Sequence, residues 1–182
     1  QPERSVLSSS SGRVAPATVR CAPVKTGKRF TTVRATLATD RPVLEVLGAF
    51  SELGLGDAAV ERVDAQPPEL PEPENCAASS SGDGAPPMHD RVELRLHPED
   101  SGFSRGDPSG VARMRGWFRL RDDEPTDTLA LLLALDAFPP TIFNAALPVG
   151  WTPTVELTAH VRARPEPGWL RARFTTRFVT GG

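Results

Sequence analysis

Cysteine is scarce in this 182-residue sequence, and its two copies lie far apart. Cys21 and Cys76 form no CxxC pair and have no histidine close by. A disulfide framework or a zinc site needs more ligands at closer spacing, so we predict no bound metal and no cofactor. Thiols outside such a framework are typical of a reducing compartment, and we therefore expect a cytoplasmic protein.

Long hydrophobic runs and an excess of charge of one sign are also lacking. No apolar run reaches the ~18 residues that a bilayer-spanning helix needs, and residues 1–13 are polar and serine-rich, unlike a secretory signal or an anchor. The formal net charge is −2, which gives no attraction to nucleic acid or to an anionic membrane. We predict neither a nucleic-acid partner nor a membrane partner.

Two common functional motifs are missing or incomplete. Without a GxSxG elbow, hydrolysis by an α/β-type Ser-His-Asp triad is not predicted. Residues 54–59 fit the GxGxxG/A fingerprint, but Pro67 and Pro68 follow too soon for the helix that a dinucleotide site requires. The three histidines are scattered and predict ordinary strand or loop positions: His89, His97 and His160.

The first half of the sequence predicts strands and no helix. The segments Ala17–Lys25, Phe30–Ala38 and Arg41–Leu53 are separated by short turns, a pattern typical of an antiparallel meander. Such a meander alone has little against which to bury its apolar face. Residues 54–90 are then rich in Pro, Gly and Ser and cannot bury enough apolar surface to offset the entropy of ordering. We interpret that stretch as a linker.

The second half alternates strands with one apolar helix. Strands are predicted at Arg91–His97, Val111–Arg121, Thr152–Arg164 and Trp169–Val179. Between the second and third of these, Thr126–Phe138 is leucine-rich around most of its circumference, which is typical of a buried helix. The order favours an α+β fold in which an antiparallel sheet wraps around this helix.

The ends of the predicted helix raise separate questions. Either Thr126 or Asp127 can cap its start, and Pro139 stops it. Asp136 lies at its C-terminal end, where the macrodipole disfavours a carboxylate by roughly 0.3–1 kcal/mol and where burial would add a desolvation cost. The position leaves open whether Asp136 is a functional group or faces solvent.

A polar pattern follows in the next predicted strand. Thr154 and Thr158 share one face of it with Glu156, because successive side chains of a strand alternate between its faces. Threonine suits a strand for packing alone. Beside a carboxylate, however, a hydroxyl can help to hold a water molecule for attack on a carbonyl carbon.

Several of these segments together resemble the C-terminal hotdog of TesB-like acyl-CoA thioesterases of actinobacteria. The resemblance covers most of Ala17–Gly182 and is most specific between Trp117 and Leu170. Its motifs are the run 127–136, the triplet 138–140, the run 150–158 and the turn 164–170, with the turn 27–29 resembling the end of an N-terminal hotdog.

The resemblance implies a double-hotdog fold with an incomplete first unit. Residues 14–53 would be the remainder of the N-terminal hotdog, 54–90 the linker and 91–182 the C-terminal hotdog. The helix of the first hotdog would lie before Gln1. Hotdog units cover a sheet edge by pairing, so we expect a homo-oligomer.

The resemblance also implies hydrolysis of acyl-CoA, within fatty acid metabolism, by an activated water and without an acyl-enzyme. Asp136 would be the general base, and Thr154 would orient the water, with Thr158 as the alternative if the register differs. A third polar residue of the family, a glutamine on the last strand, would lie beyond Gly182, because no Gln follows Gln66.

An arginine stripe allows two interpretations. Its members, about two residues apart, are Arg113, Arg115, Arg119 and Arg121. They form either a solvated sheet face balanced by Asp122, Asp123 and Glu124 or a contact for the phosphates of coenzyme A.

Other functions remain open. The first is a non-catalytic hotdog that binds acyl chains or assembles with a partner, and a further one is a small-ligand β-barrel without chemistry. Hotdog hydratases rank lower, because they use an Asp…His pair and Asp136 has no histidine on its own helix or in the loop after it.

Overall fold

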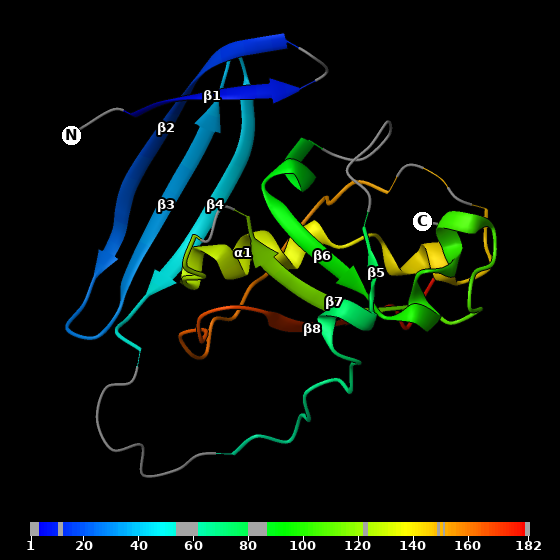
Figure 1. Cartoon of the computed structure of the whole chain (residues 1–182). Coiled ribbons are helices and arrows are strands. Elements are labelled where there is room, and N and C mark those ends of the chain that lie inside the picture. The colour runs from blue at the N-terminus through cyan, green and yellow to red at the C-terminus, as the bar shows by residue number, and fades with distance from the viewer. Residues whose placement is uncertain are drawn as a thin grey trace. The chain divides into compact units, whose positions relative to one another are not determined.

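The computed structural model describes residues 4–10, 13–53, 62–79, 87–121, 124–148, 150 and 152–180. It divides the chain into two compact units, Gln1–Ala58 and Ala59–Gly182. In Figure 1 the first unit runs from blue to cyan and the second from green to red. The glycine fingerprint at 54–59 lies outside the described residues.

The first unit is a four-stranded antiparallel sheet in the order β1-β2-β3-β4 (Figure 1). Its strands are β1 (Arg4–Ser10), β2 (Arg13–Thr26), β3 (Thr31–Ala38) and β4 (Pro42–Phe50). The predicted meander is therefore present, with one strand more than expected. Sequence propensity missed β1 because serine favours a strand weakly, whereas pairing along the long β2 supplies a full backbone ladder.

The first unit buries little apolar surface. Ala17 is its one buried hydrophobic residue among those whose side chains are described. Its fourth strand exposes a row of large apolar side chains: Val43, Leu44, Val46, Leu47 and Phe50. No helix is found among the described residues of this unit, so the unit itself does not cover these groups, as expected for a meander.

The second unit places one helix against a second antiparallel sheet, in the order β5-β6-β7-β8. Its main elements are β5 (Ala77–Ala78), β6 (Val92–Leu96), β7 (Arg113–Leu120), α1 (Thr128–Ala137) and β8 (Leu170–Thr175). Short 3-10 turns connect them: η1 (Pro73–Asn75), η2 (Pro87–Asp90), η3 (Pro98–Asp100), η4 (Gly102–Arg105) and η5 (Thr141–Asn144). The predicted α+β class is confirmed.

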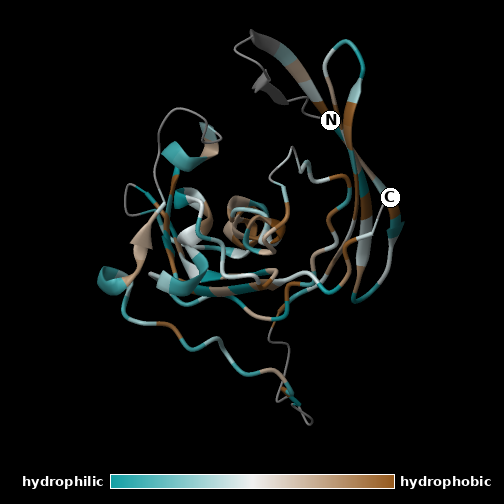
Figure 2. Cartoon of the chain, turned by 90° about the vertical axis from the view of Figure 1, so that its right-hand side faces the viewer, coloured by the Kyte–Doolittle hydropathy of each residue, from teal (hydrophilic) through white to brown (hydrophobic). Residues whose placement is uncertain are grey.

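The core of this unit lies between the sheet and the helix. Alternate side chains of β6 and β7 meet the small residues of α1, whose hydrophobic residues Figure 2 shows in brown. The buried cluster consists of Val92, Leu94, Leu96, Met114, Phe118, Ala134, Ala137 and Phe138. Gly116 permits the close approach, since a Cβ there would lie 2.4 Å from the Arg95 carbonyl oxygen and 3.1 Å from the Phe138 ring.

Local signals set both ends of α1. The Asp127 carboxylate accepts hydrogen bonds from the amides of Leu129 (2.9 Å) and Ala130 (2.8 Å), so Asp127 rather than Thr126 is the cap. At the other end Phe138 is extended, as the residue before a proline prefers to be. None of the helices in the described part of the chain is long and apolar enough to cross a bilayer.

The predicted strand Thr152–Arg164 forms no backbone ladder within the part of the chain that the structure describes. The alternating pattern predicts an extended segment, but it does not predict whether a second strand lies about 4.8 Å away to form a ladder with it. Residues 159–165 instead line a cavity of about 470 Å³ along β8, the edge strand of the sheet.

Part of the predicted linker lies on the sheet of the second unit. Within residues 62–79, β5 pairs with β6, and Pro71 accepts a 2.9 Å hydrogen bond from the Trp117 indole. Gln66 accepts a 3.4 Å bond from Arg173. The composition of this segment provides too little apolar surface for the segment to form a core of its own. Side chains of the sheet supply the contacts that hold this segment.

Candidate active site

The structure brings together two of the three candidate residues. Asp136 is the penultimate residue of α1, and Thr154 lies in the extended segment after η5. The Thr154 hydroxyl donates a 2.6 Å hydrogen bond to Asp136 Oδ1. Thr158 is exposed and makes no side-chain hydrogen bond to another described residue.

The Asp136 carboxylate keeps free acceptor capacity. Both members of the pair are exposed, and Asp136 forms no ion pair with any cation of the described residues. Its second oxygen can therefore accept a hydrogen bond from a water molecule or a ligand, since an ionised carboxylate has about four acceptor sites. Of the two arrangements that the sequence left open, the structure shows an Asp136 that faces solvent and is also held by a hydroxyl.

His89 supports the end of the helix that carries Asp136. One ring nitrogen of His89, in η2, lies 3.1 Å from the Ala137 carbonyl oxygen, one of the acceptors that a helix end leaves unpaired. The sequence assigned His89 to the linker, and no spacing signal relates residues that are 48 positions apart. Only folding places this ring beside the candidate site.

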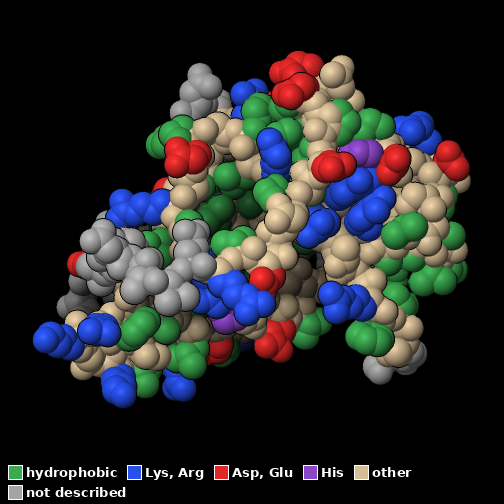
Figure 3. Space-filling model, turned by 90° about the horizontal axis from the view of Figure 1, so that it is seen from below, with side chains coloured by type: hydrophobic (Ala, Val, Ile, Leu, Met, Phe, Trp, Pro, Cys, Tyr) green, Lys and Arg blue, Asp and Glu red, His purple; other side chains and the backbone are tan. Residues whose placement is uncertain are grey.

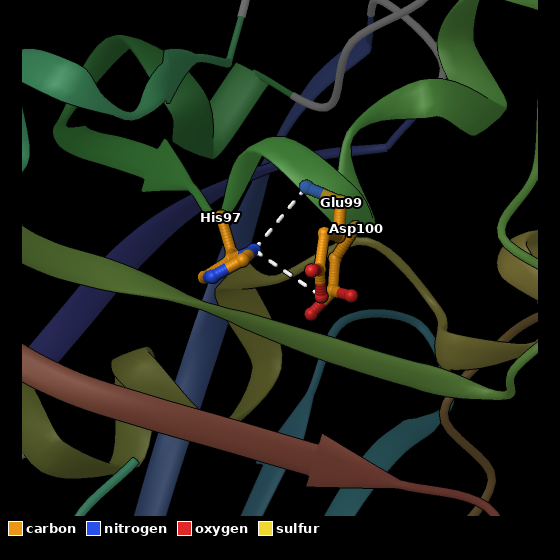
Figure 4. Close-up of side chains that lie close together, drawn as sticks. All are labelled: His97, Glu99 and Asp100. Carbon is orange, nitrogen blue, oxygen red and sulfur yellow. Dashed lines mark hydrogen bonds and ion pairs between the residues drawn. The ribbon is translucent and has the colours of Figure 1, made fainter. Parts of the chain in front are cut away.

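A second cluster of titratable groups, His97, Glu99 and Asp100, lies at η3 (Figure 4), and arginines of β7 bind to it. Asp100 is fully buried, and its Oδ2 accepts a 2.8 Å bond from Arg115 Nε. Glu99 accepts a 2.7 Å bond from Arg115 Nη2. Burial alone would raise the pKa of Asp100, but the hydrogen bonds from Arg115 and Arg113 outweigh it and hold that pKa below its ordinary value.

His97 belongs to the same cluster as a neutral acceptor. Its Nδ1 accepts the Glu99 amide at 3.2 Å and lies 3.2 Å from Arg115 Nη2. Burial, followed by the charge of Arg115, lowers the pKa of His97. A neutral ring agrees with both contacts, whereas the 3.9 Å approach to the Glu99 carboxylate would require a charged one.

The cluster offers little to a metal ion. His97, Glu99 and Asp100 present ligand-type atoms within 4.8 Å of one another. Those atoms already accept hydrogen bonds from arginine, and a guanidinium charge opposes a second cation. The arrangement is a structural ion-pair network.

Acids of β6 and η3 balance much of the arginine stripe. Basic and acidic side chains lie beside one another, next to a histidine, on the face drawn in Figure 3. Arg113 and Arg115 pair with Glu99 and Asp100. Glu124 takes part in none of the ion pairs found within the described ranges, and residues 122–123 lie outside those ranges.

The rest of the stripe is also engaged. Arg119 pairs with Glu93 at 2.6 Å, and Arg121 donates to the Val92 carbonyl. Burial would raise the pKa of Glu93, but hydrogen bonds from Arg119 and Arg95 lower it further than burial raises it. These occupied guanidinium groups do not favour the interpretation of the stripe as a phosphate contact.

Solved structures of related proteins share this architecture. A protein of Thermobifida fusca, assigned provisionally as a thioesterase II, is 32% identical with a TM-score of 0.73, over 92% of this chain and 63% of its own. A hot dog protein of Alicyclobacillus acidocaldarius is 24% identical with a TM-score of 0.62, over 76% of this chain and 50% of its own, and shares the fold. The predicted hotdog fold is confirmed.

Sequence comparison points to the same group. A Mycobacterium tuberculosis protein described as uncharacterised is 48% identical over 59 residues, which are 32% of this chain and 20% of that relative. This chain thus spans about a fifth of that relative's length and less than two thirds of each structure above. Residues 63–182 match the family described as acyl-CoA thioesterase C-terminal domain, so the chain belongs to that family, as the sequence resemblance predicted.

Proposed function

We propose that this protein hydrolyses acyl-CoA thioesters with a water molecule activated by Asp136. The hydrogen-bonded pair of Asp136 and Thr154, in a chain of the acyl-CoA thioesterase C-terminal domain family, is the observation that carries the proposal. Fatty acid metabolism in the cytoplasm is the setting that we propose for this activity.

The proposed reaction needs one proton acceptor and one oriented water. The free oxygen of Asp136 takes a proton from the water as its oxygen attacks the thioester carbonyl carbon. The C–S bond then breaks, and the proton passes to the departing thiolate, which gives a carboxylic acid and coenzyme A. Thr154 holds the carboxylate by its hydrogen bond, while Thr158 stays a second candidate for orienting the water.

The direct test is thiol release from acyl-CoA substrates of different chain length. We expect Asp136→Asn to lower kcat by roughly 10²–10⁴, the usual contribution of a general base. Thr154→Val should lower it by about threefold to tenfold, as the loss of one hydrogen bond does. Asp107→Asn, an exposed carboxyl of the same unit, is the matched control and should keep the wild-type rate.

Two outcomes would change the assignment. Full activity of Asp136→Asn would exclude Asp136 as the base. A larger loss in Thr158→Val than in Thr154→Val would transfer the orienting role to Thr158.

A non-catalytic acyl-binding module is the second candidate. The exposure of Asp136 and Thr154 favours it, because water has free access to the pair and electrostatic catalysis is strongest where water is excluded. Binding of acyl-CoA without thiol release, unaffected by Asp136→Asn, would identify this function.

A further inference from the structure

Asp136 lies in the last turn of α1, the part of a helix that its own hydrogen bonds hold least. The last four carbonyl groups of a helix have no partner within it, and helix ends fray. A basic side chain near the end can bind these carbonyls, but the last turn of α1 contains no base, and its one charged residue is the acid Asp136. The position of Asp136 therefore depends on what binds the helix end from outside.

The hydroxyl partner of Asp136 does not supply this restraint. Thr154 donates to Asp136 Oδ1, but both residues are exposed. The segment 152–164, which carries Thr154, forms no backbone ladder with any described residue. Thr154 can hold the carboxylate only as firmly as its own segment is held, so the helix end has to fix the geometry of the pair.

His89 binds the helix end from another element, η2. Its Nε2 lies 3.1 Å from the Ala137 carbonyl oxygen, and no other side chain that the structure describes donates to the carbonyls of residues 134–137. Because a carbonyl oxygen only accepts, Nε2 carries the hydrogen of this bond. The other ring nitrogen, Nδ1, is buried without a partner. Within the described residues, the ring therefore has a single polar contact, which is with the helix end.

Both ends of this hydrogen bond are anchored in the core. Met88, beside His89 in η2, packs against the core cluster, and its carbonyl accepts a 2.9 Å bond from the Arg91 amide. At the other end, Ala137 belongs to the core itself and is 1% exposed. A donor and an acceptor held in this way stay aligned without help from the exposed segment that carries Thr154.

We propose that His89 is a positioning residue, which holds the last turn of α1 so that the Asp136 carboxylate meets the Thr154 hydroxyl and the attacking water. The inference rests on the proposed function, in which Asp136 takes the proton of that water. His89 acts through Asp136, since its bond ends at the next residue along the helix. Misplacing a reacting group by about 1 Å can cost roughly 10²-fold in rate, so a looser helix end should cost a measurable part of that factor.

The first test separates kcat from KM. His89→Phe keeps a ring but removes the donor, and we expect it to lower kcat roughly fivefold to thirtyfold while KM stays within about twofold. His89→Gln, whose terminal amide donates from a similar distance along the side chain, should recover most of the rate. Ser101→Ala is the matched control: buried Ser101 donates a 2.9 Å bond to the Pro98 carbonyl, so its loss should lower the unfolding midpoint and leave kcat unchanged.

A double-mutant cycle shows whether His89 acts through Asp136. In the Asp136→Asn background, His89→Phe should lower the residual rate by less than about twofold, because the group that it positions is already lost. An equal loss in both backgrounds, or a rise in KM that accompanies the fall in kcat, would indicate a general loosening of the unit and overturn the inference. Unchanged kcat in His89→Phe would overturn it as well, while leaving the role of Asp136 intact.

The methyl resonance of Thr154, measured by NMR on threonine-labelled protein, gives a readout that does not depend on hydrolysis. In His89→Phe it should move toward its position in Asp136→Ala, whereas in His89→Gln and Ser101→Ala it should stay in place. His89→Leu repeats both assays if His89→Phe does not fold. Full activity of Asp136→Asn would refute the proposed function; a moved resonance in His89→Phe would then still uphold the restraint by His89, and an unmoved one would overturn it.

Discussion

At the residue scale, His97 and Asp100 show how neighbours determine the charge of a buried group. Asp100 is fully buried yet stays ionised, because Arg115 and Arg113 donate to its oxygens. The same Arg115 favours a neutral His97. An ion-pair network of this kind is costly to break, since removing one partner leaves an unpaired buried charge.

The lowered pKa of His97 predicts pH-dependent stability. As the pH falls, His97 of the unfolded chain binds a proton near pH 6.5, whereas His97 of the folded protein binds it only at a lower pH. The contribution of His97 to folding stability is therefore complete above about pH 6.5. It is lost as the pH falls through the lower folded pKa. We expect the urea midpoint to decrease below that pH. His97→Asn, which keeps an acceptor near Nδ1 but does not titrate, should show a smaller decrease below about pH 6.5.

An equal decrease in wild type and His97→Asn would contradict this assignment. The carboxylates Glu93 and Asp100, whose pKa values are also lowered, act at lower pH. Their contribution is present above about pH 4 and is lost as the pH falls through their folded pKa values.

At the element scale, contact between β6, β7 and α1 depends on a small residue. Gly116 pairs with Leu96 across the two strands and lies beneath the Phe138 ring. Glycine inside a strand is usually unfavourable by about 0.5–1 kcal/mol relative to alanine. Glycine occupies position 116 because the gap between the Arg95 carbonyl and the Phe138 ring is too narrow for a Cβ.

Gly116→Ala should therefore destabilise the second unit despite the better strand propensity of alanine. We expect a loss of about 1–3 kcal/mol in the free energy of unfolding, the usual cost of overpacking, measured by urea denaturation. Gly150→Ala is the control, because a Cβ at Gly150 meets nothing within 4 Å. A Gly116→Ala protein as stable as wild type would mean that β6 can move away without cost.

At the scale of the whole molecule, the exposed strand β4 suggests association. It is an edge strand of its sheet and exposes apolar side chains such as Leu47, which is 69% exposed. Exposed apolar edges are sites of pairing with another chain. We propose that a second copy of the protein covers this strand in a homo-oligomer.

Sedimentation should show a species heavier than the 19.5 kDa chain. Leu47→Glu should weaken the association roughly tenfold or more, because burying a leucine contributes about 1.5–3 kcal/mol. Val63→Glu changes a similarly exposed side chain, 67%, outside β4 and should leave the mass unchanged. A monomeric wild type would refute the proposal.

Several features of this protein could be read from its sequence because they depend on local chemistry. Strand propensity, short turns and alternation predicted β2, β3, β4, β6, β7 and β8 to within a few residues, and a leucine-rich run with a stop at Pro139 predicted α1. The sequence left its cap open between Thr126 and Asp127, and the expected burial around most of the helix is wrong, because Leu129, Leu132 and Leu135 are exposed. Asp136 and Thr154 were chosen by residue type and resemblance, and the structure joins them by a hydrogen bond.

Tertiary structure decided what depends on contacts between distant residues. Strand β1 exists because β2 offers it a ladder, while Thr152–Arg164 lacks such a partner in the described residues. The sequence could show that arginines recur, but not which of them meet Glu93, Glu99 or Asp100. Pairing depends on register and on distances that folding creates.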